Sequence, residues 1–272
     1  MRSFPIALQL YSVRDRMARD VEATLKEVSA LGYNGVEFAG LYGKSAREMR
    51  ALCEKYHLVP LSAHIPYTEL VKDPKGVIGT YAELGCQYVV IPYLTEQYRP
   101  GNALFFDVIE NAKLLGREAQ LNKMTLLYHN HDFEFKKIDG KYALDILYDS
   151  VSPDLLQTEL DLCWVKVGGE DPAEYLKKYT GRAPVVHFKD FSGKIGGKMY
   201  ALIGIDDNEE SQSEFSFRPL GRGCQDVPAL LDASSVAAAS WIVVEQDEPS
   251  DGFDTMECAK ESITCLQTYM RM

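Results

Sequence analysis

The chain has 272 residues, of which 46% are hydrophobic and 25% charged, and its formal net charge is −11. This composition is typical of a folded globular protein. The acidic charge argues against nucleic-acid binding, which needs a basic surface. No apolar run reaches the roughly 18 residues that a membrane span needs, and the N-terminal segment lacks the apolar core of a secretory signal. We therefore expect a cytoplasmic protein whose six cysteines stay reduced.

Apolar segments of strand length alternate eight times with amphipathic segments of helix length. We expect strands at about 6–11, 35–38, 59–65, 88–91, 124–129, 155–162, 184–188 and 241–245. We expect helices at about 20–32, 45–56, 77–84, 103–121, 144–148, 171–180, 227–239 and from 254 onward. Several helix ends carry clear signals: Asp20 and Asp171 are N-cap residues, and Ser45 with Glu48 has the capping-box spacing.

Eight strand–helix units predict a single (β/α)8 TIM barrel over residues 1–272, because this fold typically needs about 250 residues. A doubly wound open sheet is the alternative. It is disfavoured because no glycine-rich phosphate loop follows the first strand. The segment at about 191–227 is rich in Gly, Ser, Asp and Glu. We expect it to be a long loop after the seventh strand that serves as a mobile lid or an oligomer contact.

The fifth expected strand ends in the segment YHNHDFEF at residues 128–135. His129 and His131 project from the same face of an extended chain, because side chains alternate with a period of two. Glu134 follows three residues later and can fold back toward them. Imidazoles and a carboxylate at this spacing suit a divalent metal or proton transfer. The structural alternative is a pair of hydrogen-bonded histidines that close one end of the barrel.

The next three expected strands end in further pairs that share a face: Glu159 and Asp161, His187 and Lys189, Glu245 and Asp247. Each pair also has a structural explanation. Asp161 can cap the turn after its strand, His187 can be a core histidine, and Glu245 can form an ion pair with Lys189. Ligand-type residues at the same end of four successive strands nevertheless favour a metal site at the carboxyl end of the barrel.

These motifs resemble those of the xylose isomerase-like barrel superfamily of sugar isomerases and epimerases, which also contains inosose dehydratase and endonuclease IV. The resemblance extends from residues 9–12 to 244–247 and includes ELDLCWV (159–165), HFKD (187–190) and PLGRG (219–223). In the epimerases, four residues from strands five to eight hold one divalent ion: Glu, Asp, His and Glu. The matching positions are Asp161, His187 and Glu245. On strand five this chain has histidines, so Glu134 or His131 is the expected fourth ligand, with Glu134 preferred.

The resemblance implies an enzyme that binds one Mn, Zn, Co or Mg ion and acts on a sugar or keto-sugar through an enediolate. We expect an isomerase or epimerase. The alternative is a keto-sugar or inosose dehydratase, because the histidine-containing strand is more similar to that branch. The implied catalytic residues are Glu134 and Glu245 as bases, His129 or His131 for oxygen protons, and Lys189 for the oxyanion. The candidate substrate-binding residues are Glu37, His64, Trp164 and Arg222.

Two further functions fit the same barrel less well. A DNA repair enzyme of the endonuclease IV type needs three zinc ions, many histidines and a basic face, whereas this chain has five histidines and a net charge of −11. A non-catalytic sugar-binding barrel would need no metal. The expected partner is therefore a small-molecule sugar, without nucleic acid or membrane, and assembly into a homo-oligomer stays open.

Overall fold

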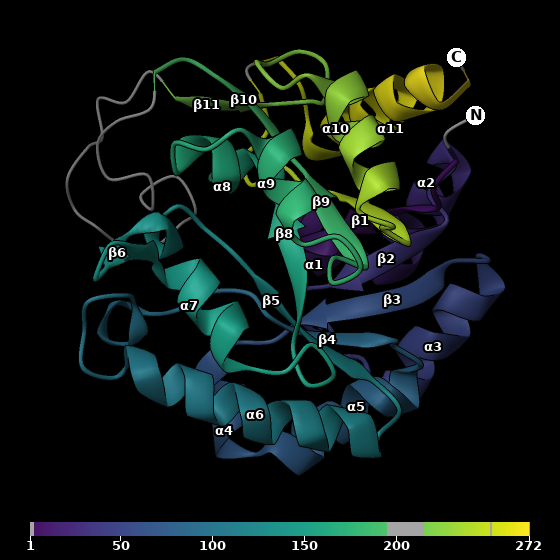
Figure 1. Ribbon diagram of the computed structural model, residues 1–272. Helices are drawn as coiled ribbons and strands as arrows, with labels where there is room; N and C mark the ends of the chain where they lie inside the picture. The colour runs from purple at the N-terminus through teal and green to yellow at the C-terminus, as the bar shows by residue number, and fades with distance from the viewer. Residues whose placement is uncertain (1–2, 195–214, 251, 272) are drawn as a thin grey trace.

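A computed structural model describes residues 3–194, 215–250 and 252–271. Its core is a closed barrel of parallel strands in the order β1-β12-β9-β8-β5-β4-β3-β2 (Figure 1). The expected (β/α)8 barrel is thereby confirmed. The barrel strands are β1 Ile6–Gln9, β2 Gly35–Phe38, β3 Val59–His64, β4 Tyr88–Ile91, β5 Thr125–His129, β8 Gln157–Asp161, β9 Val185–Phe188 and β12 Trp241–Val244.

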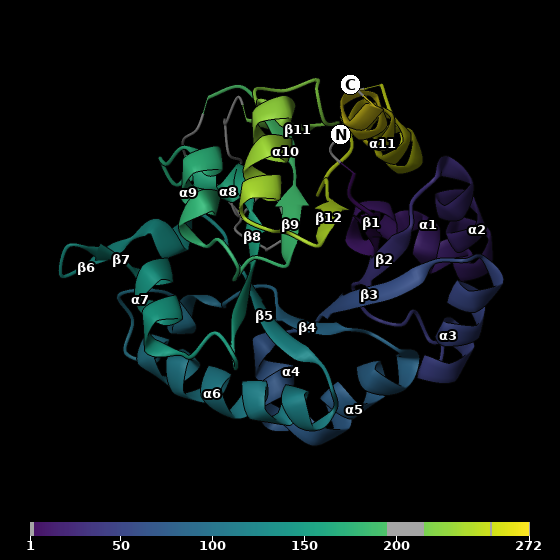
Figure 2. The same cartoon turned by 45° about the vertical axis from the view of Figure 1, so that its right-hand side comes forward.

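Helices surround the barrel on its outside, and α11 packs beside α2, so that the last helix meets the first long one (Figure 2). Within the described residues, no helix is long and apolar enough to cross a membrane. The α-helices are α1 Arg14–Arg19, α2 Val21–Leu31, α3 Ala46–Lys55, α4 Tyr67–Lys72, α5 Pro74–Leu84, α6 Phe105–Leu121, α7 Ala143–Ser150, α8 Leu162–Val167, α9 Pro172–Lys178, α10 Val227–Val236 and α11 Thr255–Arg271. Short 3-10 helices are η1 Leu10–Val13, η2 Glu96–Tyr98 and η3 Phe133–Phe135.

The capping hydrogen bonds predicted at the helix starts are formed in the structure. The Asp20 carboxylate accepts the backbone N–H of Ala23, and the Asp171 carboxylate accepts that of Glu174. Ser45 and Glu48 form both bonds of the capping box. These caps satisfy N–H groups that have no partner within the helix.

Two features differ from the expected pattern. The third crossover contains α4 as well as α5, because Pro66 and Asp73 each begin a separate helix. The sixth strand ends at Asp161, and Leu162 already belongs to α8, because the Asp161 carboxylate caps that helix by accepting the N–H of Trp164. Local hydrogen bonding at Asp161 therefore ends the strand earlier than the apolar run suggests.

The barrel interior changes from apolar to polar along the strands. A buried apolar layer is formed by Ala7, Leu61, Val90, Leu127, Val185 and Val243. Two residues further along three of these strands stand His129, His187 and Glu245, which are also buried. Strand alternation places them on the same inward face. The polar side chains at the barrel mouth therefore rest on a closely packed apolar floor.

Two small antiparallel sheets lie outside the barrel: β6 (Lys137–Ile138) with β7 (Lys141–Tyr142), and β10 (Asp190–Ser192) with β11 (Ser216–Arg218). The second of these pairs the start of the long segment predicted at 191–227 with residues 216–218. Residues 195–214, the middle of that segment, lie outside the described residues. Its role as a lid or an oligomer contact therefore stays a prediction.

Candidate active site

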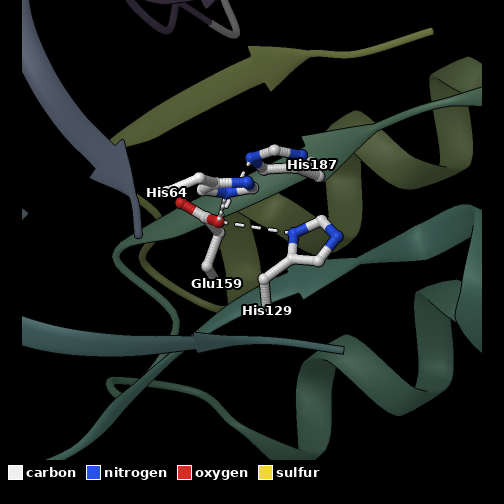
Figure 3. Close-up of side chains that lie close together, drawn as sticks. All are labelled: His64, His129, Glu159 and His187. Carbon is white, nitrogen blue, oxygen red and sulfur yellow. Dashed lines mark hydrogen bonds and ion pairs between the residues drawn. The ribbon is translucent and has the colours of Figure 1, made fainter. Parts of the chain in front are cut away.

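The carboxylate of Glu159, from β8, lies among three imidazoles that come from three other strands (Figure 3). Its Oε2 lies 2.6 Å from Nε2 of His64, 3.3 Å from Nδ1 of His129 and 3.3 Å from Nε2 of His187. Glu159 and His187 are completely buried, and His129 is nearly so. Such a cluster of ionisable groups is costly to bury unless charges balance and hydrogen bonds form.

A second buried carboxylate, Glu37 from β2, supports the same imidazoles. Its Oε1 lies 2.8 Å from Nε2 of His187 and 3.1 Å from Nε2 of His64. Gln9 and Ser62 donate hydrogen bonds to its two oxygens. Burial alone would lower the pKa of His64, but the carboxylates of Glu37 and Glu159 raise it to about 10. The sequence predicted Glu37 and His64 near the substrate. In the structure only His64 borders the cavity, and Glu37 lies beneath it.

A second group of possible ligands lies on the other side of two of these histidines: His129, Asp161, His187 and Glu245. Nε2 of His129 lies 3.9 Å from Oδ2 of Asp161, and Nδ1 of His187 lies 3.1 Å from Oε2 of Glu245. Each of the two imidazoles thus presents one nitrogen to Glu159 and the other to the outer carboxylates. The structure brings together the three predicted ligands Asp161, His187 and Glu245, and the ligand atoms of the group all lie within 4.8 Å of one another.

In the outer group, Oδ2 of Asp161 is a buried oxygen without a partner in hydrogen-bond geometry. On the inner side, Nδ1 of His129 and Nε2 of His187, which face Glu159, and Oε1 of Glu159 also lack such a partner. Buried polar groups are nearly always paired, so unpaired ones need a ligand or a functional explanation. Two imidazole nitrogens with two carboxylate oxygens form a donor set that suits Zn²⁺, Mn²⁺ or Co²⁺. The residues present therefore fit a divalent ion.

Lys189 lies beside this group and directly follows β9 at the barrel mouth. Its Nζ lies 2.9 Å from Oε2 of Glu245 and donates to both oxygens of Asp247 at 3.1 and 3.0 Å. It also lies 3.6 Å from Oδ2 of Asp161. Burial alone would lower the pKa of Lys189, but Asp247 and Glu245 raise it well above its usual range. The ion pair of Glu245 with Lys189, considered from the sequence as a structural alternative, is present and stands beside the possible ligands.

Glu134 is not part of either group of possible ligands, in contrast to the sequence-based preference. It is completely buried, its Oε1 accepts the hydroxyl of Tyr128 at 2.5 Å, and its Oε2 accepts the N–H of His131 at 2.8 Å. The short helix η3, which begins at Phe133, turns this carboxylate back toward the chain rather than into the barrel. The structure thus does not bring Glu134 into either group of possible ligands, and it places His129 in both groups.

The second histidine of the pair, His131, lies just above the cluster and borders the cavity. Its ring stacks on Phe133 and Trp164, with centroid separations of 5.5 and 5.2 Å, and its Nδ1 has no hydrogen-bond partner. Burial lowers the pKa of His131 well below its usual range, helped by the nearby Lys189. A neutral imidazole with an unpaired nitrogen at a cavity wall can accept a proton from a bound molecule.

A cavity of about 920 Å³ opens over these side chains. His64, His129, His131, Lys189, Glu245 and Asp247 form its inner end. Its walls include Tyr11 and Tyr93, and the outer part runs between the loop after β2 and the helices α4 and α5. The volume is within the range of roughly 300–1,000 Å³ that is typical of small-molecule sites.

The remaining two predicted substrate residues do not border this cavity. Trp164 is fully buried, stacks on His131 and lies 5.4 Å beneath Nζ of Lys189, so it supports both side chains. Arg222 is exposed, pairs with Glu261 and lies over Phe253. The motif around Arg222 has a structural role instead. The Asp190 carboxylate accepts N–H groups of that loop, and a side chain at Gly223 would lie 2.2 Å from it.

Two residues that complete the cluster were not among the predicted site residues. Glu159 shares a face with Asp161, and that alternation is the sequence signal that could have identified it. Gln9 ends β1 and donates to Glu37, but no local pattern distinguishes it from a surface glutamine.

The buried Glu134 leads to a testable pH dependence of stability. Burial raises its pKa from 4.5 to about 8, against the opposing effect of its hydrogen bonds, of which the one from Tyr128 is the strongest. The folded chain therefore keeps a proton that the unfolded chain releases, and stability falls as the pH rises through this window. Relative to Glu134→Gln, we expect the wild type to lose about 1.4 kcal/mol per pH unit between about pH 4.5 and 8. Urea denaturation of both proteins across this range measures it, and parallel curves would contradict the assignment.

The sequence profile of the xylose isomerase-like TIM barrel family matches residues 25–269. The chain belongs to this family. An inosose dehydratase from Clostridium beijerinckii is 23% identical over 255 residues, covering 84% of this chain and 82% of that protein. These relatives and the geometry of the site indicate an enzyme.

Solved structures of other proteins show the same fold. A sugar phosphate isomerase/epimerase from Parabacteroides distasonis superposes with a TM-score of 0.77 at 22% identity, over 96% of this chain and 93% of that one. The IOLI protein, whose structure contains a bound zinc atom, superposes with a TM-score of 0.70 at 17% identity, over 98% of both chains.

Proposed function

We propose that this barrel is a metal-dependent dehydratase of an inosose-like keto-sugar or keto-polyol. The observation that carries the proposal is the segment at and after the end of β5. His129 belongs to the group of possible ligands and His131 borders the cavity, whereas the carboxylate of Glu134 accepts hydrogen bonds from Tyr128 and His131. The two-glutamate arrangement of the epimerases that the sequence resembles is therefore incomplete. The similarity to inosose dehydratases supports the same choice.

The residues that we propose to hold one divalent ion are His129, Asp161, His187 and Glu245. A bound ion would polarise the carbonyl of a keto-sugar and favour loss of the neighbouring proton. In this assignment Nε2 of His129 and Nδ1 of His187, which lie toward Asp161 and Glu245, would hold the ion, and their other nitrogens face Glu159. A carboxylate behind a ligating histidine holds the ring in one tautomer and orientation.

Dehydration needs a base for the proton next to the carbonyl, stabilisation of the oxyanion, and departure of a hydroxide two carbons from the carbonyl carbon. We assign the base to His131, because its ring is neutral, borders the cavity and has an unpaired nitrogen. Lys189 carries the nearest ammonium at the cavity wall and stabilises the developing negative charge. As the C–H bond breaks, its electron pair forms the enediolate. The proton passes to His131, the electron pair then expels the hydroxide, and the protonated imidazole of His131 returns the proton to that oxygen, so that it leaves as water.

The test of this function is a panel of keto-sugars and inososes incubated with the protein and each of Mn²⁺, Zn²⁺, Co²⁺ and Mg²⁺. We expect metal-dependent loss of one water, detected by mass spectrometry. A product of unchanged mass but different retention time would instead identify an isomerase or epimerase. If no compound of the panel exchanges its proton next to the carbonyl with deuterated water, the proposal of an enediolate enzyme is wrong.

Removing the Glu159 carboxylate, which lies behind the two histidines, should weaken metal binding without removing a metal ligand. For Glu159→Gln we expect metal affinity to fall about 10–100-fold, because the imidazoles of His129 and His187 lose their orienting acceptor. Competition with a fluorescent chelator measures the affinity directly. Substituting Glu170 with Gln serves as the matched control, because this half-buried carboxylate accepts a hydrogen bond from Tyr142 and belongs to neither group of possible ligands, and it should leave the affinity unchanged. Equal affinity in both variants would remove Glu159 from the metal-binding arrangement.

A further inference from the structure

The cavity is much longer than the cluster of imidazoles and carboxylates at its inner end. Its outer part runs between residues 39–41, which follow β2, and the pair of helices α4 and α5 as far as Tyr81. We call this outer part the side groove. At about 920 Å³ the whole cavity lies near the top of the range for drug-sized ligands. A single sugar ring placed at the inner end would leave the side groove empty.

The walls of the side groove are mainly apolar. Leu41, Ile65, Pro66, Val77 and Tyr81 contribute to them. Space is also left open at the backbone: a side-chain carbon added to Gly40 would meet no atom within 4 Å. An apolar group that enters such a groove gains about 25 cal/mol for each Å² that it removes from water.

The charge of the cavity argues against a substrate that carries a phosphate group in the side groove. Among the described lining residues, carboxylates stand at both ends, with Glu69 and Asp73 in the side groove and Glu245 and Asp247 at the inner end. Lys189 is the one Lys or Arg among them, and its ammonium is bound by Glu245 and Asp247. A phosphate group needs cationic or N–H partners, so the side groove repels a phosphorylated substrate.

We propose that the substrate is an unphosphorylated sugar derivative that carries an apolar substituent. The sugar ring lies against the imidazole and carboxylate cluster, and the substituent lies in the side groove. This inference rests on the proposed function, because it extends the substrate of the same site. It names a substrate class, an uncharged glycoside-like compound with an apolar or aromatic group.

The experiment compares three probes that share one sugar ring: methyl β-D-glucopyranoside, phenyl β-D-glucopyranoside and D-glucose 6-phosphate. Binding to the metal-loaded protein is measured by calorimetry, which needs no turnover. We expect the phenyl glucoside to bind about tenfold more tightly than the methyl glucoside, because the ring becomes buried. We expect the phosphate to bind no better than the methyl glucoside.

Two variants fill the side groove from α5: Val77→Phe and Thr80→Phe. Both should reduce the affinity for the phenyl glucoside to that for the methyl glucoside and leave the latter unchanged. The control is Lys75→Phe, which adds the same ring on the exposed side of α5, outside the cavity lining. Thermal melting verifies that each variant is folded. Two positions are used so that the test can still be made if one of the two variants does not fold.

Equal binding of the phenyl and methyl glucosides, or tighter binding of the phosphate, would overturn the inference. So would the absence of binding by all three probes in a protein that still dehydrates a keto-sugar, and in that case the proposed function stands. If the protein neither binds these probes nor exchanges the proton of any keto-sugar, the proposed function and the inference fail together.

Discussion

Replacing Asp161 with asparagine is expected to remove the bound divalent ion and to lower turnover by at least about a thousandfold. Asp161 is fully buried, and its Oδ2 has no hydrogen-bond partner, so that oxygen is available to a cation. Its other oxygen caps α8, and an asparagine keeps that bond. A thousandfold corresponds to about 4 kcal/mol of transition-state stabilisation, which is in the range of metal-ion catalysis. Bound metal is measured by elemental analysis and turnover on the best substrate of the panel.

The matched control for this experiment is Glu134→Gln, also a buried carboxylate at the end of a barrel strand. Because both oxygens of Glu134 are engaged by Tyr128 and His131, we expect this variant to keep its metal. Loss of metal in Glu134→Gln together with retention in Asp161→Asn would restore the assignment that the sequence favoured. Retention in both variants would place the ion elsewhere.

The second large effect is expected for His131→Asn, which should keep the metal but lower turnover by about 10²–10⁴-fold. This is the usual contribution of a positioned general base. His131 borders the cavity and does not belong to either group of possible ligands. Metal content and turnover are measured on the same preparation, so that loss of a base and loss of the ion are separated.

His57→Asn is the matched control for His131, since His57 is exposed in the turn after α3. Its backbone has φ of 56°, a conformation that asparagine tolerates well. We expect the control to retain full metal and full turnover. If His131→Asn loses its metal, His131 is a ligand rather than the base. If it keeps full activity, another group removes the proton.

The sequence by itself determined the barrel and the strand ends that carry the chemistry. The eightfold alternation of strands and helices depends on local periodicity, which can be recognised in the sequence alone. The same period of two placed ligand-type residues on a shared face at the ends of successive strands, and the resemblance to the family selected Asp161, His187 and Glu245 among them. The structure brings these three together with His129. The caps at Asp20 and Ser45 were equally predictable, because each involves residues only three apart.

Only the tertiary structure decided what depends on contacts between distant segments. The direction of Glu134 is set by the hydroxyl of Tyr128 and by the turn of η3, whereas strand alternation ends at His129. The pairing of one imidazole with carboxylates on both sides requires β2, β8, β9 and β12 to be in place. The partner of Arg222 depends on tertiary structure for the same reason, since its ion pair with Glu261 joins a loop to α11. Periodicity predicts which face a side chain occupies, but which partner it meets there is decided by packing between segments that are remote in the chain.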